Sequence, residues 1–253
     1  MTMHAHTDSP SATQCAHASH CPRPVRLEVL ARTPLFHGMG DILSNVEKRM
    51  RAQAWATGEY LYMEGDRAHD LFVLASGSAK VIKTTVDGVE TIFEILGPGD
   101  LFGGLSNLGI AHYSESVQTL EPTCALRIGS SDFRRLLADY PQVAVRAFDE
   151  VTTQLLDARG IFKKTSTGTV RERVAYALLR LAGKFGEQQS TALVIHVPLS
   201  RSEIAAMTGS TTESVSRVMS QMRRDGIIGP GRKQISIVKL SQLQELAQEF
   251  TLD

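Results

Sequence analysis

Three polar residues near the C-terminus, Glu213, Ser216 and Arg217, have the types and the spacing that a helix needs to contact DNA bases. Residues four apart lie on one side of a helix, so Glu213 and Arg217 would share an exposed face, with Ser216 beside them. An arginine can bond bidentately to O6 and N7 of guanine, and a glutamate can accept a hydrogen bond from the cytosine amine. The same pair could also be an ordinary surface ion pair worth a few tenths of a kcal/mol. The surrounding elements must decide between these two interpretations.

Two short helices are predicted around these residues. Ser200 and Glu203 have the spacing of a capping box, which predicts that a helix begins there and ends at Gly209. Thr211 can cap a second helix that runs from Thr212 to about residue 225. Two short helices joined by a tight glycine-containing turn are typical of a helix-turn-helix, whose second helix enters the major groove. The residues expected to face inward are Ile204, Ala205 and Met207 in the first helix, and Val215, Val218, Met219 and Met222 in the second.

The charge around the two helices favours nucleic acid as the partner. The whole chain has 27 basic and 27 acidic residues, so a DNA-binding surface must come from local segregation of charge. Residues 201–239 supply that segregation, since they hold seven basic and three acidic side chains. Residues 226–237 predict a strand, a basic turn and a second strand, which is the wing of a winged helix-turn-helix. Five residues are expected to contact the DNA backbone: Arg201, Thr211, Thr212, Arg232 and Lys233.

The sequence also argues against several other classes of protein. No apolar run approaches the ~18 to 20 residues needed to cross a bilayer, and no basic stretch followed by an apolar one begins the chain, so we expect a cytoplasmic protein. The sequence contains no P-loop, zinc-hydrolase motif or nucleophile elbow, which argues against an enzyme. Three widely separated cysteines argue against a disulfide scaffold.

The segment from Trp55 to Ile128 has the pattern of many short strands. Alternating apolar runs are separated by glycines at turn positions, which predicts a small antiparallel barrel or double-sheet roll with a pocket between its sheets. A short helix over Gly40 to Arg51, begun by Asp41, is expected to precede it. Residues 1–30 are expected to form a flexible tail, because they mix Thr, Ser, Ala, Pro and four histidines without a sustained apolar period.

A long helix is predicted from Pro141 to about Lys164. Apolar residues recur along it at alternating steps of four and three, which is typical of a helix that packs lengthwise on a partner helix. The alternative is a helix that packs on its own barrel. Residues 165–168 are predicted to be the hinge that follows this helix. The seam consists of Ala144, Phe148, Val151, Leu155, Ala158 and Phe162.

These elements predict an α+β protein of four parts. Residues 1–30 are the flexible tail that contains Cys and His, and residues 31–140 form the antiparallel β-roll. Residues 141–168 form a dimerisation helix with its hinge, and residues 169–253 form the winged helix-turn-helix DNA-binding domain.

With these elements in this order, residues 35–247 resemble the CRP/FNR family, that of the cyclic-AMP receptor protein and the fumarate-nitrate reduction regulator. The most specific shared segments are the Gly97-Pro98-Gly99-Asp100-Leu101-Phe102-Gly103 turn and Thr212-Glu213-Ser214-Val215-Ser216-Arg217. The resemblance implies a cyclic-nucleotide-binding-like jelly roll and a homodimer that places one reading helix per subunit in successive major grooves of palindromic promoter DNA. RNA polymerase is a further implied partner. The recognition helix is similar to the fumarate-nitrate type, which implies a half-site of TTGAT type; Thr212 stands where the cyclic-AMP receptor has Arg.

The resemblance places an effector pocket in the roll near Gly103, Gly104, Tyr113 and Ser114. Cyclic-nucleotide binders of the family use a Glu shortly after the turn and an Arg-Ser pair for the cyclic phosphate, whereas Gly104 and Tyr113-Ser114 stand at these places here. No cation is expected there for a phosphate. The sequence therefore argues against cyclic AMP, while Ser114 and backbone amides leave another ligand open.

Cys15, Cys21 and Cys124 are candidate metal ligands, because the oxygen-sensing branch of the family holds a 4Fe-4S cluster on four cysteines. The fit is incomplete: Ala12 stands where the first cysteine should be, so a histidine of the tail would have to supply the fourth ligand of an iron-sulfur cluster. Zinc on the Cys/His tail and haem are alternatives. The remaining interpretation is a tail with incidental Cys and His, and Cys124 as a small buried strand residue.

The function expected from these features is that of a homodimeric, sequence-specific transcription regulator that responds to a redox, gas or small-molecule signal through its roll. The alternative is a ligand-binding regulatory module that acts on a protein partner. The helix-turn-helix argues against that alternative.

Overall fold

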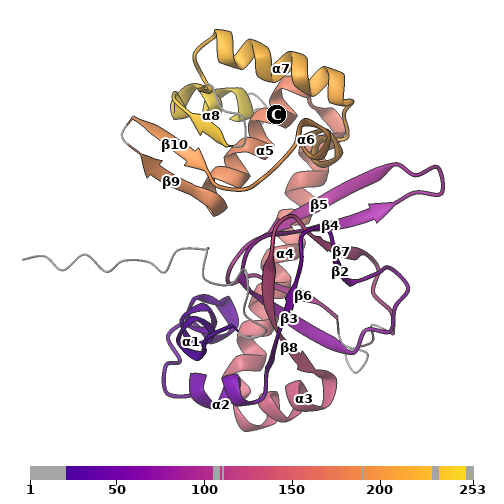
Figure 1. Cartoon of the computed structure of the whole chain (residues 1–253), viewed down its shortest axis with the longest axis vertical. Helices are drawn as coiled ribbons and strands as arrows, with labels where there is room; N and C mark the ends of the chain where they lie inside the picture. The colour runs from indigo at the N-terminus through magenta and orange to yellow at the C-terminus, as the bar shows by residue number, and fades with distance from the viewer. Residues whose placement is uncertain (1–20, 105–108, 110, 190, 230–233, 249–253) are drawn as a thin grey trace, which may run out of the picture.

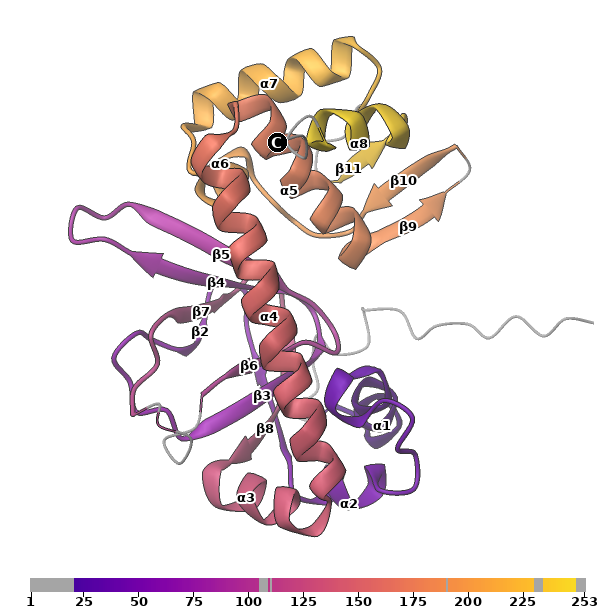
Figure 2. The same cartoon turned by 180° about the vertical axis from the view of Figure 1, so that it is seen from behind.

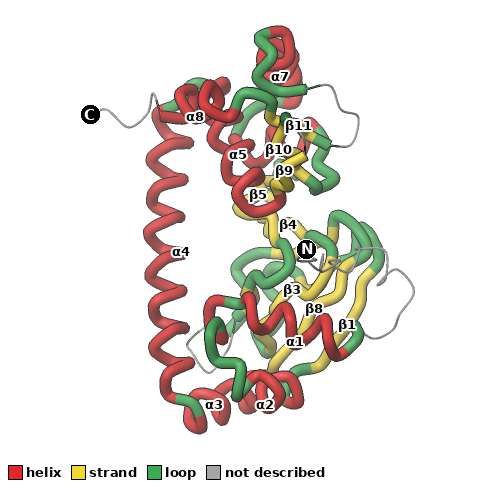
Figure 3. The backbone as a smooth tube through the Cα atoms, turned by 90° about the vertical axis from the view of Figure 1, so that its left-hand side faces the viewer, coloured by secondary structure: helices red, strands yellow, loops and turns green. Residues whose placement is uncertain are grey.

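A computed structural model describes residues 21–104, 109, 111–189, 191–229 and 234–248, without the side chains of residues 157 and 161–167. Two bodies lie one above the other along the longest axis, a roll with short helices beside it and a C-terminal domain of helices and a small sheet (Figure 1). One long helix, α4 (Pro141–Thr167), runs beside the roll and leads to the second body. Figure 2 shows this helix in front of the roll, and Figure 3 shows it standing along one side.

The roll consists of two four-stranded sheets that are antiparallel throughout, which confirms the predicted fold class. The first sheet has the order β1-β8-β3-β6 and the second has the order β2-β7-β4-β5. Glycines at positive φ, such as Gly58, Gly77 and Gly88, form turns between the strands. The strands are β1 (Arg51–Trp55), β2 (Tyr60–Tyr62), β3 (Asp70–Ser76), β4 (Ala79–Thr84), β5 (Glu90–Leu96), β6 (Leu101–Gly103), β7 (Ser116–Thr119) and β8 (Thr123–Gly129).

Strand alternation gives the first sheet two buried faces. On β8, Ala125 faces the aromatic cluster between the two sheets, whereas Cys124 and Leu126 face an outer cluster under the helices. That outer cluster also receives Val143 from the first turn of α4. The helices of this layer are α1 (Arg23–Arg32), η2 (Pro34–Phe36), α2 (Leu43–Lys48) and α3 (Ser130–Asp139).

The N-terminal boundary predicted from the sequence is wrong over its last part. Residues 23–30 of the predicted flexible tail belong to α1, and Val29 and Leu30 on this helix are buried. The sequence signal was weak because α1 has little amphipathic character, and its order comes from burial against the roll and the other helices. Arg23 and Arg26 hold the helix through ion pairs of 3.3 and 2.8 Å to Glu47, which is buried.

Two further boundaries differ from the prediction. The helix expected over 40–51 is shortened to α2, and Asp41 is not its cap, because helical hydrogen bonding begins only after Ile42. The hinge expected over 165–168 is also narrower. Helix α4 continues to Thr167, and the extended backbone of Gly168 and Thr169 makes the break.

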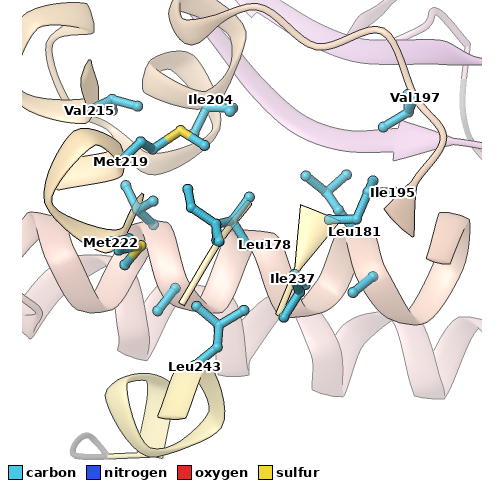
Figure 4. Packing of buried hydrophobic residues seen from close by; sticks show 14 of the residues in the cluster. Leu178, Leu181, Ile195, Val197, Ile204, Val215, Met219, Met222, Ile237 and Leu243 are labelled. Carbon is cyan, nitrogen blue, oxygen red and sulfur yellow. The ribbon is translucent and has the colours of Figure 1, made fainter. Parts of the chain in front are cut away.

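The C-terminal domain is built on α5 (Val170–Phe185), whose capping box at Thr169 and Glu172 fixes its start. A small sheet of order β11-β10-β9 lies beside it, and β9 was not predicted. Side chains from α5 and the later elements meet in one core (Figure 4). The later elements are β9 (Gly186–Gln189), β10 (Ala192–Ile195), α6 (Arg201–Thr208), α7 (Thr212–Arg224), β11 (Ile235–Ile237) and α8 (Leu240–Gln248). In the described residues, no helix is long and apolar enough to cross a membrane.

Candidate nucleic-acid interface

The first helix of the helix-turn-helix begins as predicted. The Ser200 hydroxyl accepts from the Glu203 backbone N–H at 3.2 Å, and the Glu203 carboxylate accepts from the Ser200 N–H at 2.6 Å. These two bonds satisfy N–H groups that the first helical turn leaves open. Gly209 ends α6 in the left-handed conformation, with φ 55°, a region that residues with a Cβ adopt at a cost. The turn into α7 therefore depends on that glycine.

The second helix, α7, presents one buried and one exposed face. Thr211 caps it by accepting from the Ser214 N–H at 3.2 Å. Val215, Met219 and Met222 are buried in the domain core, in agreement with the predicted stripe (Figure 4). The opposite face is left to solvent, so α7 has the arrangement that a DNA-reading helix requires.

The three predicted base-reading residues lie on or beside that free face. The Arg217 guanidinium and the Glu213 carboxylate form an ion pair of 2.6 Å, and their side chains are 74% and 81% exposed. Ser216 lies between them and is half-buried. So exposed a pair contributes little to stability, because water and ions compete for both groups. Base edges in a groove can therefore replace it at small cost.

The residues predicted to contact the DNA backbone differ in their exposure to solvent. Thr211 and Thr212 are exposed at the start of α7, but Arg201 is half-buried, and its guanidinium donates to the Met219 sulfur. Burial lowers the pKa of Arg201, and nearby Arg223 lowers it further. Arg232 and Lys233, in the predicted wing turn, lie outside the described residues. The segments on either side of this turn are paired, since Ile228 pairs with Ile237 and the Gly229 N–H donates to the Ser236 carbonyl at 2.7 Å.

Sequence reasoning missed a polar cleft at the starts of α6 and α7. It has a volume of about 400 Å³ and lies where the helix-turn-helix meets the β4–β5 hairpin. Its hydroxyl groups gather there because Ser and Thr are favoured at helix N-termini, a signal that the sequence does carry. The lining residues are Lys80, Glu90, Ser200, Ser202, Glu203, Ala205, Ala206, Ser210, Thr211 and Thr212.

The structure brings together three of the four residues predicted for the effector pocket. The Tyr113 hydroxyl donates to the Asp70 carbonyl at 3.0 Å and accepts from the Asp70 N–H at 3.3 Å. The Gly104 N–H donates to the same carbonyl at 3.4 Å. Gly103 has φ +96°, and a Cβ there would lie 2.9 Å from that oxygen. Ser114 differs from these three, because it is exposed and donates to Glu115.

Two features near these residues were not predicted. The Tyr62 ring stacks on the Tyr113 ring at 3.7 Å between centroids, within an aromatic cluster that also contains Phe72 and Phe102. Burial raises the pKa of both tyrosines. The second feature is a cation beside Ser114, although the place of the family's Arg holds Tyr113. Lys83 is 3.4 Å from the Ser114 carbonyl and forms an ion pair of 2.9 Å with Glu64.

The candidate metal ligands fall into two groups. Cys21 and Cys124 are each 2% exposed and belong to the same apolar cluster, whereas Cys15 lies outside the described residues. Within the described part of the chain, no three His, Cys, Asp or Glu side chains gather as a metal site would require. An iron-sulfur cluster needs four ligands, so the described residues do not complete a set for it.

The predicted seam on α4 is exposed to solvent at each of its described side chains. Phe148 is 73% exposed, Val151 63% and Leu155 52%, and Ala144 and Ala158 are exposed as well. The side chain of Phe162 lies outside the described part. The chain's own roll therefore does not cover the described seam residues, which argues against packing on that roll.

Known proteins match both bodies of the chain. A family model described as a cyclic nucleotide-binding domain matches residues 52–140, and a Crp-like helix-turn-helix domain matches residues 172–246. The cyclic AMP receptor protein of Thermus thermophilus is 30% identical over 220 residues, which is 85% of this chain and 97% of that protein. The transcriptional activator protein anr of Pseudomonas aeruginosa is 29% identical and covers 85% of this chain and 87% of its own length. The structure of FixK2 from Bradyrhizobium japonicum has a TM-score of 0.71 at 25% identity, covering 78% of this chain and 96% of that one.

Proposed function

Because the chain belongs to the CRP/FNR family of transcription regulators, which are not enzymes, we propose that it acts as a homodimer that reads a TTGAT-type palindrome in promoter DNA. In this proposal, Glu213, Ser216 and Arg217 contact base edges. The observation that supports it is the position of these residues on the free face of α7, where Glu213 and Arg217 pair with each other. On binding, the Arg217 guanidinium would leave the Glu213 carboxylate and donate to a guanine. The freed carboxylate would then accept a hydrogen bond from a cytosine amine.

Dimerisation is supported by the exposed apolar stripe on α4. Three large side chains, Phe148, Val151 and Leu155, stay more than half exposed on one face of a long helix. Covering such a stripe with the same stripe of a second copy removes apolar surface from water in both subunits. A two-fold arrangement would also give the two α7 helices the symmetry of a palindrome, with half-site centres about 34 Å apart.

The signal in this proposal acts through the roll. The tyrosine pair lies in the aromatic cluster between the sheets, and Lys83 contacts the carbonyl of Ser114, which follows Tyr113 in the chain. The Arg-Ser pair that binds the cyclic phosphate in cyclic-nucleotide binders is missing here. The charge of Lys83 is already paired with Glu64, so Lys83 does not replace that arginine. The proposed effector is therefore a small ligand other than cyclic AMP. A redox or gas signal, through an iron-sulfur cluster or haem, is the second candidate, because anr-type activators are among the similar proteins. To distinguish the two candidates, the protein is purified without oxygen, its bound iron and sulfide are determined, and its absorbance spectrum is recorded. Bound iron with an absorbance band favours the redox or gas signal, and a colourless protein without iron favours the small ligand. RNA polymerase is the proposed partner on the promoter.

Base reading is tested by binding of the dimer to a labelled TTGAT palindrome against a scrambled duplex of equal length and composition. Arg217→Ala should abolish the preference for the palindrome while it leaves the fold intact. Arg135→Ala is the matched control, because Arg135 on α3 forms a similar helical ion pair and is 71% exposed. A preference that survives in Arg217→Ala at the wild-type level contradicts the proposal.

A further inference from the structure

The β-roll and the DNA-binding domain share one apolar core. Ile82, Ile92 and Ile95, on the β4–β5 hairpin of the roll, belong to the same cluster as Val197 and Ile204 of the C-terminal domain. In Figure 4, Val197 lies on the side of this core next to the hairpin ribbon. The hairpin is therefore the surface on which the DNA-binding domain is seated (Figures 1 and 2).

One cation at the end of α5 joins the DNA-binding domain to this seat. The Lys184 ammonium donates to Glu94 Oε1 at 3.0 Å, to Asp100 Oδ2 at 2.5 Å and to the Ile95 carbonyl at 2.8 Å. Its side chain is 27% exposed, as is that of Asp100. Burial raises the pKa of Asp100, and the Lys184 charge opposes that rise. A single ammonium thus connects the DNA-binding domain to β5 and to the turn that follows it.

The residue after Lys184 packs on the same turn. The Phe185 ring covers Gly97, where a Cβ would lie only 2.6 Å from Phe185 Cε1. Gly97 has no left-handed backbone, so its lack of a side chain serves the close approach of the ring. The Asp100 carboxylate also accepts from the Gly97 N–H at 2.6 Å, which holds the two ends of the turn together.

The Gly97–Asp100 turn is firmly attached to the sensor domain. The Gly99 N–H donates to the Leu74 carbonyl at 2.8 Å, and the Leu74 N–H donates to the Asp100 carbonyl at 3.0 Å. The turn leads directly into β6, whose last residue, Gly103, belongs to the proposed effector pocket. A displacement of β6 by an effector would therefore move the groups that Lys184 and Phe185 contact.

We propose that Lys184 is a positioning residue, which with Phe185 fixes the DNA-binding domain on the Gly97–Asp100 turn and so sets the direction in which α7 faces DNA. The proposal rests on the proposed function, in which two α7 helices act as a pair. The covalent link from α4 to α5 is only the extended backbone at Gly168 and Thr169. Without the seat, that link would let the domain pivot, and the spacing between the two reading helices would no longer be fixed.

The test compares Lys184→Met with Lys184→Arg and with the control Arg180→Met. Arg180 is exposed on the same helix and belongs to no site described above. Hydrogen exchange in the free full-length protein, at β5 and at the end of α5, measures how often the domain leaves its seat. Lys184→Met should raise that exchange, because the ion pairs that hold the domain are lost. The expected rise is only about fivefold, since partly exposed ion pairs contribute little free energy. Lys184→Arg and Arg180→Met should stay near wild type.

The second measurement is the ratio of affinities for two TTGAT palindromes that differ by one base pair in the spacer. One base pair turns a half-site by about 35° around the DNA axis, which a fixed pair of helices does not tolerate. Lys184→Met should lower this ratio about fivefold, whereas a residue that only stabilises the fold would lower both affinities and leave the ratio unchanged. Wild-type exchange or a wild-type ratio in Lys184→Met overturns the proposal. If the variant does not fold, Glu94→Gln at a 44% exposed carboxylate gives the same two measurements.

The two proposals fail in different ways. If the wild-type protein prefers neither palindrome over a scrambled duplex, the proposed function fails, and the exchange measurement still tests the seat. If the wild-type protein binds with strict spacing and Lys184→Met does the same, only the positioning role is overturned.

Discussion

Replacement of Phe148 by aspartate should separate the proposed dimer into folded monomers. Phe148 is 73% exposed in the subunit, so most of its surface is available to a partner. Complete burial of such a side chain contributes about 1.5–3 kcal/mol, which leaves about 2 kcal/mol for the fraction that is still exposed. A two-fold interface contains Phe148 of both subunits. Phe148→Asp therefore removes about 4 kcal/mol of the free energy of association and raises the dimer Kd about a thousandfold.

Sedimentation equilibrium over a range of protein concentrations measures that Kd, and thermal unfolding followed by circular dichroism checks the fold. The free energy of unfolding of the subunit should change by no more than about 0.5 kcal/mol, because the Phe148 side chain is already largely in water. Thr153→Asp is the control, since it places the same charge on the same helix at an exposed position away from the seam. A Phe148→Asp protein that dimerises as tightly as Thr153→Asp would refute the assignment of this helix as the interface.

Two further predictions concern the interior of the roll. The Tyr62 hydroxyl is buried near the Gly103 amide and has no hydrogen bond of normal geometry among the described residues, so Tyr62→Phe should change the free energy of unfolding at pH 7 by less than about 1 kcal/mol. Burial raises the pKa of Tyr62, so above a pH of about 10 the unfolded chain loses a proton that the folded chain retains, and stability falls as the pH rises. Urea unfolding at neutral and alkaline pH should show a smaller alkaline loss in Tyr62→Phe than in wild type, and an equal loss would contradict the burial of this hydroxyl. Gly103→Ala should cost about 1–3 kcal/mol in the same assay, because φ is +96° and the new Cβ would lie 2.9 Å from the Asp70 carbonyl. Gly88→Ala is its control, since φ is +78° there but no atom lies within 4 Å of the added Cβ. Equal losses of stability in the two variants would show that the close contact at Gly103 does not contribute.

Local sequence signals predicted the helix-turn-helix well. The Ser200–Glu203 capping box and the Gly209 stop act within a few residues, so their types and spacing determine the structure. The tyrosine stack could not be predicted in the same way. Alternation along a strand tells which residues share a face, but Tyr62 and Tyr113 meet only through the pairing of strands that are distant in sequence.

The remaining differences also arise from tertiary contacts. Helix α1 is ordered because Val29 and Leu30 are buried, although its own periodicity is weak. Lys184 has nothing in its local sequence that distinguishes it from another surface lysine. Its three contacts come from β5 and the following turn, about 90 residues earlier in the chain.

A cycle of protein and base substitutions determines whether Arg217 reads a guanine. The Kd of wild type and of Arg217→Ala is measured for the TTGAT palindrome and for the same palindrome with that guanine replaced by adenine. A bidentate contact contributes about 1–3 kcal/mol per half-site, so the wild-type protein should lose at least about tenfold in affinity on the base change. Arg217→Ala should bind the two duplexes with nearly equal, weaker affinity. If Arg217→Ala still distinguishes the two duplexes as strongly as the wild-type protein, Arg217 does not read that base.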